Sequence, residues 1–347
     1  MNRVSRLPAL LLALTTLALT ACSDEPAVER QRFLSLGTHI EVQTAGAETE
    51  RAREAIRVVR EDLAYLHSGL HPWEPGALAR VNQMLAATGE FTADPGTLEA
   101  LAVSRPLYRD SDGLFNPALG KLADAWGFHQ DAPAGPPPEA ATIEAILEAE
   151  PSPDDLTVDG VRMTNTNPAV QLDFGGVAKG MGVDHAVGLL REHGIDNAIV
   201  NAGGDLRAYG QRGDRPWRVG IRDPRGDGVL AGLTIEGDEA VFTSGDYERY
   251  YEHDGKRYHH ILDPRTGRPA RGVTSVTVIH DEGATADAAA TALFVADADQ
   301  WPRIAKQMGI EAVLRVDDEG VLHLTPAMAE RLELKKDDVT TRIVELP

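Results

Sequence analysis

The segment that organises this sequence is Asp173-Phe174-Gly175-Gly176-Val177-Ala178-Lys179-Gly180, which joins a short strand to a helix expected over residues 176–193. Adjacent glycines let the backbone approach a ligand closely, and the free amide groups of a helix N-terminus favour an anion. Lys179 falls on the apolar arc of the expected helix, between Ala186 and Leu190. Its ammonium group either meets a bound anion or reaches water while its stem covers apolar surface. The segment alone leaves both interpretations open.

Helical spacing dominates the chain before this segment. Apolar residues recur at Ala52, Ile56, Val59, Leu63 and Leu66, which predicts a helix over residues 48–66 with one buried stripe. A first strand is expected over residues 33–42 and an exposed proline-rich loop over 132–138. Glycine and proline separate further helices expected near residues 75–86, 95–110, 117–126 and 139–149.

Strand patterns dominate the rest of the chain. The expected strands are 156–163, 196–201, 205–210, 217–222, 229–235, 239–242, 257–262 and 273–280, with a helix near 284–308 and short strands at the end. Early helices, late hairpins and few βαβ alternations favour an α+β fold of mixed, largely antiparallel sheets packed with helices. We expect residues 33–347 to form one domain.

Composition excludes several classes of protein. The 347 residues carry a formal net charge of −20, with 42% hydrophobic and 25% charged residues, so neither a disordered chain nor a polytopic membrane protein fits. The negative charge disfavours nucleic acid as a partner. The single cysteine excludes an intrachain disulfide and a zinc site built from several thiolates.

The first 21 residues have the features of a bacterial export signal. Arg3 and Arg6 precede an apolar run from Leu7 to Leu19, which is shorter than the roughly 20 residues that a spanning helix needs. Leu19-Thr20-Ala21-Cys22 resembles the lipobox of bacterial lipoproteins. We therefore expect a signal peptide over residues 1–21, lipidation of Cys22, a tether over residues 22–32 and a location on the periplasmic side of a bacterial membrane. A soluble secreted protein is the alternative.

Two polar turns are candidates for binding. Asn201-Ala202-Gly203-Gly204-Asp205 links two apolar strands, either as an ordinary tight hairpin or as a second glycine cradle for a phosphate or a ring. Thr243-Ser244-Gly245-Asp246 follows an apolar strand and offers hydroxyl groups that suit either a turn or a ligand cup.

Asp287 and Thr291 are spaced four residues apart in an alanine-rich helix, so both project from one face, which we expect to be exposed. A carboxylate and a hydroxyl are hard oxygen donors of the kind that bind Mg²⁺. Local capping and back-bonding to a carbonyl are the structural alternative for this pair.

A histidine pair ends another strand, in His259-His260-Ile261-Leu262-Asp263-Pro264-Arg265-Thr266-Gly267-Arg268-Pro269. Neighbouring strand residues face opposite ways, so one histidine is the stronger candidate, and His260 adjoins the turn. A neutral imidazole can accept a hydroxyl proton, whereas a charged one can bond phosphate.

Taken in order, these segments resemble the ApbE-type FAD:protein FMN transferases. The resemblance covers roughly Phe33 to Val316. Its further motifs are Leu36-Gly37-Thr38, Leu78-Ala79-Arg80-Val81-Asn82, Gly113-Leu114-Phe115-Asn116-Pro117, Trp126-Gly127-Phe128 and Trp217 to Pro224. It implies a Mg²⁺-dependent enzyme that moves FMN from FAD to a threonine hydroxyl of a target protein, as a phosphoester, and releases AMP.

The resemblance also implies roles for the candidate residues. Asp287, Thr291 and a backbone carbonyl at or next to Gly176 would hold the metal. The flavin nucleotide and its phosphates would be bound by Gly175, Lys179, Asn201, Gly203, Gly204, Asp205, Thr243, Ser244 and His260. His260 is the first candidate for the general base and Asp246 the second. Asn116 stands where many relatives have aspartate.

Three functions follow as hypotheses. The first is the transferase, with flavin-bearing subunits of membrane redox pumps or other extracytoplasmic flavoproteins as acceptors. The second is an FAD pyrophosphatase that lets water replace the threonine and yields FMN and AMP. The third is a flavin-binding lipoprotein without chemistry.

Overall fold

The structure is a computed structural model that describes residues 27–87, 89–130 and 132–347. The predicted signal peptide and Cys22 lie outside the described residues. Among the helices of the described part of the chain, none is long and apolar enough to cross a membrane.

A nine-stranded sheet runs through the molecule, and its strands are antiparallel except for the final pair. In sheet order they are β1 (Val28–Ser35), β2 (Thr38–Ala45), β6 (Ala198–Ala202), β7 (Asp205–Tyr209), β12 (Asp238–Gly245), β17 (Val273–His280), β18 (Ala312–Asp317), β19 (Leu322–Leu324) and β21 (Thr341–Ile343). The predicted α+β class with largely antiparallel sheets is therefore confirmed.

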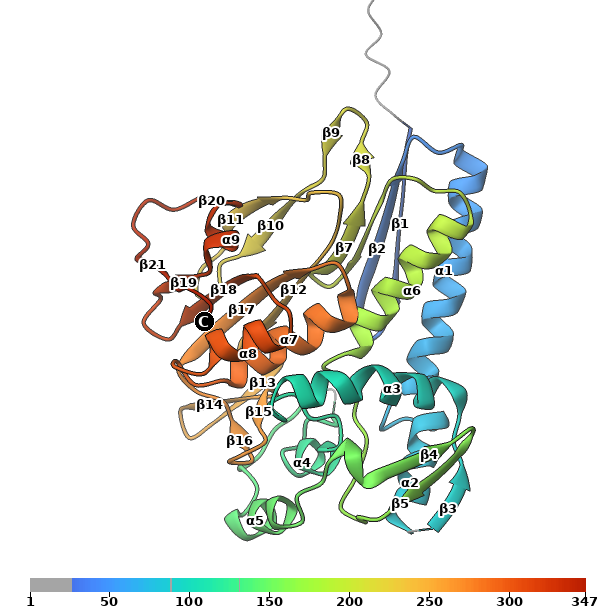
Figure 1. Ribbon diagram of the computed structural model, residues 1–347, viewed down its shortest axis with the longest axis vertical. Coiled ribbons are helices and arrows are strands. Elements are labelled where there is room, and N and C mark those ends of the chain that lie inside the picture. The colour runs from blue at the N-terminus through green and yellow to red at the C-terminus, as the bar shows by residue number, and fades with distance from the viewer. Residues whose placement is uncertain (1–26, 88, 131) are drawn as a thin grey trace, which may run out of the picture.

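Both faces of this sheet are buried, because alternate residues of its strands enter two different cores. Phe242 of β12 and Val278 of β17 belong to the core under the helices, whereas their neighbours Val241 and Ile279 belong to the core on the opposite face. The helical face is covered by α1 (Thr49–Leu70), α6 (Ala178–Glu192) and α7 (Gly283–Val295), seen in Figure 1. The opposite face is covered by a small sheet of β10 (Arg218–Arg222), β11 (Val229–Thr234) and β20 (Leu332–Leu334).

The residues between α1 and α6 form a layer at one end of these helices (Figure 1). It contains α2 (Ala77–Ala86), α3 (Pro95–Asp110), α4 (Gly120–Ala125), α5 (Ala140–Glu148), η1 (Pro153–Asp155) and the sheet of β3 (Gly89–Thr92), β5 (Arg162–Asn165) and β4 (Leu156–Asp159). The remaining elements are β8 (Gln211–Arg212), β9 (Arg215–Pro216), β13 (Tyr250–His253), β14 (Lys256–His259), β15 (Leu262–Asp263), β16 (Arg268–Pro269), α8 (Trp301–Gln307) and α9 (Pro326–Ala329).

Several predicted boundaries are wrong, and turn geometry explains most of them. The single strand expected over 33–42 is a hairpin, because Leu36 and Gly37 take φ values of 50° and 70° and reverse the chain. Its first strand begins at Val28, so the last five residues of the predicted tether are part of the sheet. The helix expected over 284–308 is two helices, since α7 ends at Val295 and the second helix begins at Trp301 with Pro302 in its first turn.

Two other predicted strands divide in the same way. The strand expected over 156–163 is the hairpin of β4 and β5, which turns at Gly160 with a φ of 59°. The strand expected over 257–262 ends at His259, and the chain forms a new short pair of strands from Leu262.

α6 and α7 cross in direct backbone contact. A methyl group on Gly180 would lie 2.3 Å from the carbonyl oxygen of Gly283, and a methyl group on Gly283 would lie 2.8 Å from the carbonyl oxygen of Gly180. Neither atom can move away without shifting a helix. The crossing therefore requires glycine at both positions, and it brings the N-termini of the two helices together.

This crossing predicts opposite effects for two alanine substitutions in α6. Gly180→Ala should lower the free energy of unfolding by about 1–3 kcal/mol, because the new methyl group overpacks the crossing. Gly188→Ala is the matched control, because a methyl group there meets no atom within 4 Å. It should raise the free energy of unfolding by about 0.5–1 kcal/mol through helix propensity. Urea unfolding of both variants tests this, and equal effects would contradict the described crossing.

Candidate active site

The residues predicted to hold a metal lie together where α6, α7 and β12 meet. The Thr291 hydroxyl is 3.3 Å from the Ser244 hydroxyl, and a methyl group on Gly176 would lie 3.4 Å from the Thr291 oxygen. One turn earlier in α7, the Asp287 carboxylate accepts a hydrogen bond of 3.0 Å from the Gly180 amide. Segments that are more than a hundred residues apart in the chain thus converge on one place.

Asp287 is buried, with 5% of its surface exposed, so the expectation of an exposed helix face is wrong. The physical reason is that α7 packs against α6 and against strands of the large sheet, leaving most of its residues buried. Burial is the main cause that raises the pKa of Asp287 to about 7, with Lys179 opposing the rise and Asp205 adding to it. A cation beside this buried carboxyl group would therefore stabilise its charged form.

The donor chemistry fits a hard divalent cation. Asp287 and Thr291 offer a carboxylate and a hydroxyl, Ser244 a second hydroxyl, and the chain around Gly176 a backbone carbonyl, and Mg²⁺ prefers such oxygen ligands. Across the described residues, no group of three or more His, Cys, Asp or Glu side chains could hold a metal. A metal in this site would therefore depend on hydroxyl, carbonyl and water oxygens as well as on one carboxylate.

Lys179 lies beside this cluster, and its ammonium group does not simply extend into water from an apolar helix face. Its ammonium group forms an ion pair with Asp205, whose residue is 4% exposed, and Asp205 also accepts a 2.8 Å hydrogen bond from the Thr243 amide. Burial alone would lower the pKa of Lys179, but the carboxylates of Asp205 and Asp287 outweigh burial and raise it. The lysine is therefore a fixed positive charge at the start of α6.

The Asn201–Asp205 segment is the tight hairpin between β6 and β7. The Asn201 side chain accepts a 3.0 Å hydrogen bond from the Gly204 amide, and Gly203 packs against Thr38 with a φ of 69°. These residues shape the turn, and among them Asp205 faces Lys179. The structure does not bring the side chain of Asn201 to the cluster.

Thr243 and Ser244 point to opposite faces of the large sheet. The Ser244 hydroxyl faces α7, whereas the Thr243 hydroxyl lies 2.9 Å from the Thr277 hydroxyl on the other face. Only the Thr243 amide contributes to the site, through its hydrogen bond to Asp205. Gly175 donates its amide to the Asp173 carboxylate at 2.8 Å, which shapes the turn before α6.

The ApbE family pattern matches residues 36–314, most of the chain. This chain belongs to the ApbE family.

Similar proteins of this family are known by name and by structure. A Rhodobacter capsulatus protein named FAD:protein FMN transferase is 46% identical over 303 residues, which cover 87% of this chain and 58% of that protein. The chain thus spans less than two thirds of the length of that relative. A Vibrio cholerae protein of the same name is 35% identical over 70% of this chain and 73% of its own length.

Solved structures share the fold. The ApbE protein of Thermotoga maritima has a TM-score of 0.81 and 31% identity, covering 88% of this chain and 99% of that one. The apo form of the Pseudomonas stutzeri flavinyl transferase ApbE has a TM-score of 0.76 and 31% identity, covering 88% and 97%.

In this ApbE-family chain the two predicted general bases differ in their surroundings. Both oxygens of Asp246 accept hydrogen bonds from Arg225, at 2.7 and 2.6 Å. Asp246 also lines a separate cavity of about 160 Å³ with His259. Because its carboxylate is occupied by a guanidinium group, the geometry does not favour it as a proton acceptor.

His260 is neutral and presents one free ring nitrogen. Its Nδ1 lies 3.2 Å from the Arg249 carbonyl, which can only accept, so Nδ1 carries the proton and Nε2 has the free lone pair. Enclosure of the ring is the main cause that lowers the pKa of His260 to about 3, and nearby His259 and Lys179 contribute to the fall. His260 can therefore accept a hydrogen bond from a hydroxyl group, but it does not act as a cation on phosphate.

Glu248 is a candidate that the sequence did not reveal. The residue as a whole is exposed, but desolvation of its carboxyl group is the main cause that raises the pKa of Glu248 to about 7, with Lys179 opposing the rise and Asp205 adding to it. Residues 248–252 and 132–134 line an open cavity of about 460 Å³. A glutamate in an exposed turn carries no sequence signal, and only its closeness to Lys179 and Asp205 marks it.

The Lys179–Asp205 pair predicts a stability effect. Lys179→Met should lower the free energy of unfolding by about 3 kcal/mol, because it leaves the buried Asp205 carboxylate without its counter-ion. The exposed pair Arg109–Asp154, at 2.6 Å, is the matched control, and Arg109→Met should change the free energy of unfolding by less than about 1 kcal/mol. Urea titrations measure both variants. An unchanged free energy of unfolding in Lys179→Met would contradict the prediction that Asp205 needs Lys179 as its counter-ion.

The pKa of His260 predicts a pH dependence of stability. In the unfolded chain histidine takes up a proton near pH 6.5, whereas folded His260 does so only near pH 3. The unfolded state is therefore favoured as the pH falls from 6.5 towards 3. Between pH 7 and pH 5 the wild type should lose about 2 kcal/mol more unfolding free energy than His260→Gln. If the unfolding free energies of the two proteins changed in parallel with pH, the imidazole ring of His260 would not be enclosed.

Proposed function

We propose that this protein transfers FMN from FAD to a threonine hydroxyl of a target protein, with release of AMP and with Mg²⁺ as cofactor. The names of its relatives support flavin transfer. The observation that carries the proposal is the convergence of Asp287, Thr291 and Ser244 on the glycine turn before α6, next to Lys179.

Asp287 and Thr291 would hold the metal, together with a carbonyl at or next to Gly176. When bound, Mg²⁺ supplies positive charge to phosphate oxygens and lowers the barrier to attack on phosphorus. A cation held there would also offset the cost of burying the Asp287 carboxylate. Metal and substrate are thus expected to stabilise the folded enzyme together.

The protein's own groups would place the two reactants. Lys179 and the N-terminus of α6 would hold the pyrophosphate. Both positive groups are fixed in place, so they would stabilise the developing charge without rearranging during the reaction. The acceptor threonine oxygen forms a bond to the FMN phosphorus, the bond from that phosphorus to the AMP oxygen breaks, and the hydroxyl proton leaves to a base.

The His260 Nε2 atom is the group that we assign to orient the hydroxyl through a hydrogen bond. With a pKa of about 3 it is a weak proton acceptor, so positioning is its main contribution. Glu248 is the nearby carboxyl with a pKa suited to receive a proton at neutral pH. This division of roles separates orientation of the hydroxyl from removal of its proton.

We propose further that the mature protein is anchored through a lipid on Cys22 at the periplasmic side of a bacterial membrane. Its acceptors would be extracytoplasmic flavoproteins, including flavin-bearing subunits of membrane redox pumps. The apolar run before Cys22 and the lipobox-like residues support the anchor.

Asp287→Ala tests the proposed metal site. Incubated with FAD, Mg²⁺ and an acceptor domain, the variant should lose at least about 100-fold in the rate of FMN attachment, because the metal loses its carboxylate. Mass spectrometry of the acceptor and chromatography of AMP measure the loss. Asp281→Ala is the matched control, since Asp281 lies just before α7 and its side chain is 79% exposed.

The same assay separates the alternatives. AMP release with FMN free in solution and no mass gain on the acceptor would reject the transferase in favour of FAD hydrolysis. Bound flavin without AMP under any metal would identify a carrier. An unchanged rate in folded Asp287→Ala would contradict the metal assignment.

A further inference from the structure

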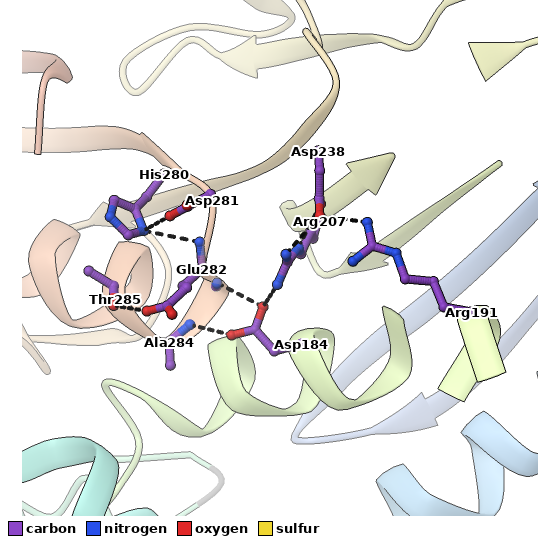
Figure 2. Close-up of polar contacts among 10 residues, drawn as sticks. Asp184, Arg191, Arg207, Asp238, His280, Asp281, Glu282, Ala284 and Thr285 are labelled. Atoms are coloured by element: carbon purple, nitrogen blue, oxygen red, sulfur yellow. Dashed lines mark hydrogen bonds and ion pairs between the residues drawn. The ribbon is translucent and has the colours of Figure 1, made fainter. Parts of the chain in front are cut away.

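The N-terminus of α7 is held by a carboxylate from another helix. The amides of Gly283 and Ala284 donate to the two oxygens of Asp184, at 2.8 and 2.9 Å, and Asp184 belongs to α6 (Figure 2). The first amides of a helix have no partner within it, and a side chain that accepts from them acts as a cap. Asp184 is therefore the N-terminal cap of α7, supplied across the helix crossing.

The residues that precede α7 are engaged elsewhere. Glu282 occupies the usual capping position but makes no capping hydrogen bond with its side chain. Its amide donates to His280 at 3.0 Å, and its carboxylate accepts the Thr285 hydroxyl at 3.0 Å (Figure 2). No local side chain among those drawn takes the place of Asp184.

Asp184 is itself fixed by a chain of ion pairs. Arg207 donates to Asp184 at 2.6 Å and, through two further nitrogens, to Asp238 at 2.9 Å each, and Arg191 donates to Asp238 at 2.6 Å (Figure 2). The Arg207 side chain is 14% exposed. Burial alone would lower the pKa of Arg207, but its hydrogen bonds to the two carboxylates outweigh burial and raise it. The guanidinium group keeps its charge and holds the Asp184 carboxylate in one orientation.

This network joins the metal-site residues to the large sheet. Asp205 and Arg207 lie two residues apart in β7 and project from the same face. Asp205 binds Lys179 near the start of α6, and Arg207 binds Asp184 further along the same helix. One strand therefore fixes both the charge at the start of α6 and the cap of α7.

The two helices also exchange carboxylate contacts in opposite directions. Asp184 of α6 accepts from the amides of Gly283 and Ala284 in α7, and Asp287 of α7 accepts from the Gly180 amide in α6. A cation on Asp287 would take up part of the hydrogen-bonding capacity of that carboxylate. The Asp184 cap would then still hold the first turn of α7.

We propose that Asp184 is a positioning residue of the divalent-cation site, which sets α7 so that Asp287 and Thr291 face the glycine turn at Gly176. This inference rests on the proposed function, in that it assigns the cation to Asp287 and Thr291. Asp184 would act through its hydrogen bonds to α7 and not as a ligand of the cation.

Mn²⁺ binding measured without FAD or acceptor tests the proposal directly. The signal of free Mn²⁺ in electron paramagnetic resonance gives the Kd for wild type, Asp184→Asn and Asp184→Ala. We expect Asp184→Ala to raise the Kd about tenfold, the usual effect of removing a group that orients a metal ligand. Asp184→Asn keeps one acceptor oxygen and should lie between the two. In the transfer assay the Mg²⁺ concentration for half-maximal rate should rise by the same factor, with kcat at saturating Mg²⁺ changed by less than threefold.

Glu239→Gln is the matched control for general destabilisation. Glu239 neighbours Asp238 on β12 but faces the other side of the sheet, and it accepts two 2.7 Å hydrogen bonds from the guanidinium group of Arg331. Its variant should lose unfolding free energy and keep the wild-type Kd for Mn²⁺. If Asp184→Ala is not folded, Arg207→Lys is measured in its place. Lysine keeps the positive charge but loses the planar guanidinium group that binds both carboxylates.

The outcomes separate the two levels of the proposal. A wild-type Kd in folded Asp184→Ala, or an equal loss in Glu239→Gln, would overturn the positioning role while leaving the metal site intact. Wild-type affinity in Asp287→Ala, or no Mn²⁺ binding by the wild type, would overturn the metal site of the proposed function and the positioning role with it.

Discussion

The backbone contact between Gly180 and Gly283 is the constraint on which the site depends. It lets α6 and α7 approach so closely that a methyl group on either glycine would clash with the carbonyl oxygen of the other glycine. At that distance a carboxylate on either helix reaches the free amides of its neighbour, as Asp184 and Asp287 do. The candidate active site is built from the N-terminal ends of the two helices, and larger residues at the crossing would separate them.

Electrostatics in this region follow from burial in an acidic protein. Asp205, Glu248 and Asp287 gather around Lys179, and desolvation of the carboxyl groups is the main cause that raises the pKa of Glu248 and Asp287 to about 7. Such a cluster is poorly suited to a pyrophosphate by itself, because carboxylates and phosphates repel each other. A divalent cation held by Asp287 and Thr291, as proposed, would reconcile the two, since it would compensate the carboxylate and attract the phosphate oxygens. The acidic composition and an anionic substrate are therefore compatible under the proposed function.

Sequence patterns found the residues whose chemistry depends on local spacing. Asp287 and Thr291 share a helix face because four residues make about one turn, and the glycine pair before α6 marks a turn that a larger residue would obstruct. The patterns did not distinguish the faces of the sheet at Thr243 and Ser244, and they did not show that Asp246 is occupied by Arg225. They also missed Glu248 and Asp184, which acquire their roles from partners distant in the chain.

The sequence by itself determined the periodic elements, the antiparallel α+β class and the polar turns, because these depend on residues that are near neighbours in the chain. It did not determine the hairpin at Leu36–Gly37, the break between α7 and α8 or the burial of Asp287. Only the tertiary structure decided which helix caps α7, which carboxylates share Lys179 and which hydroxyls face one another. The physical reason is that capping, ion pairing and desolvation act through space over a few ångströms, between atoms whose separation along the chain carries no such information.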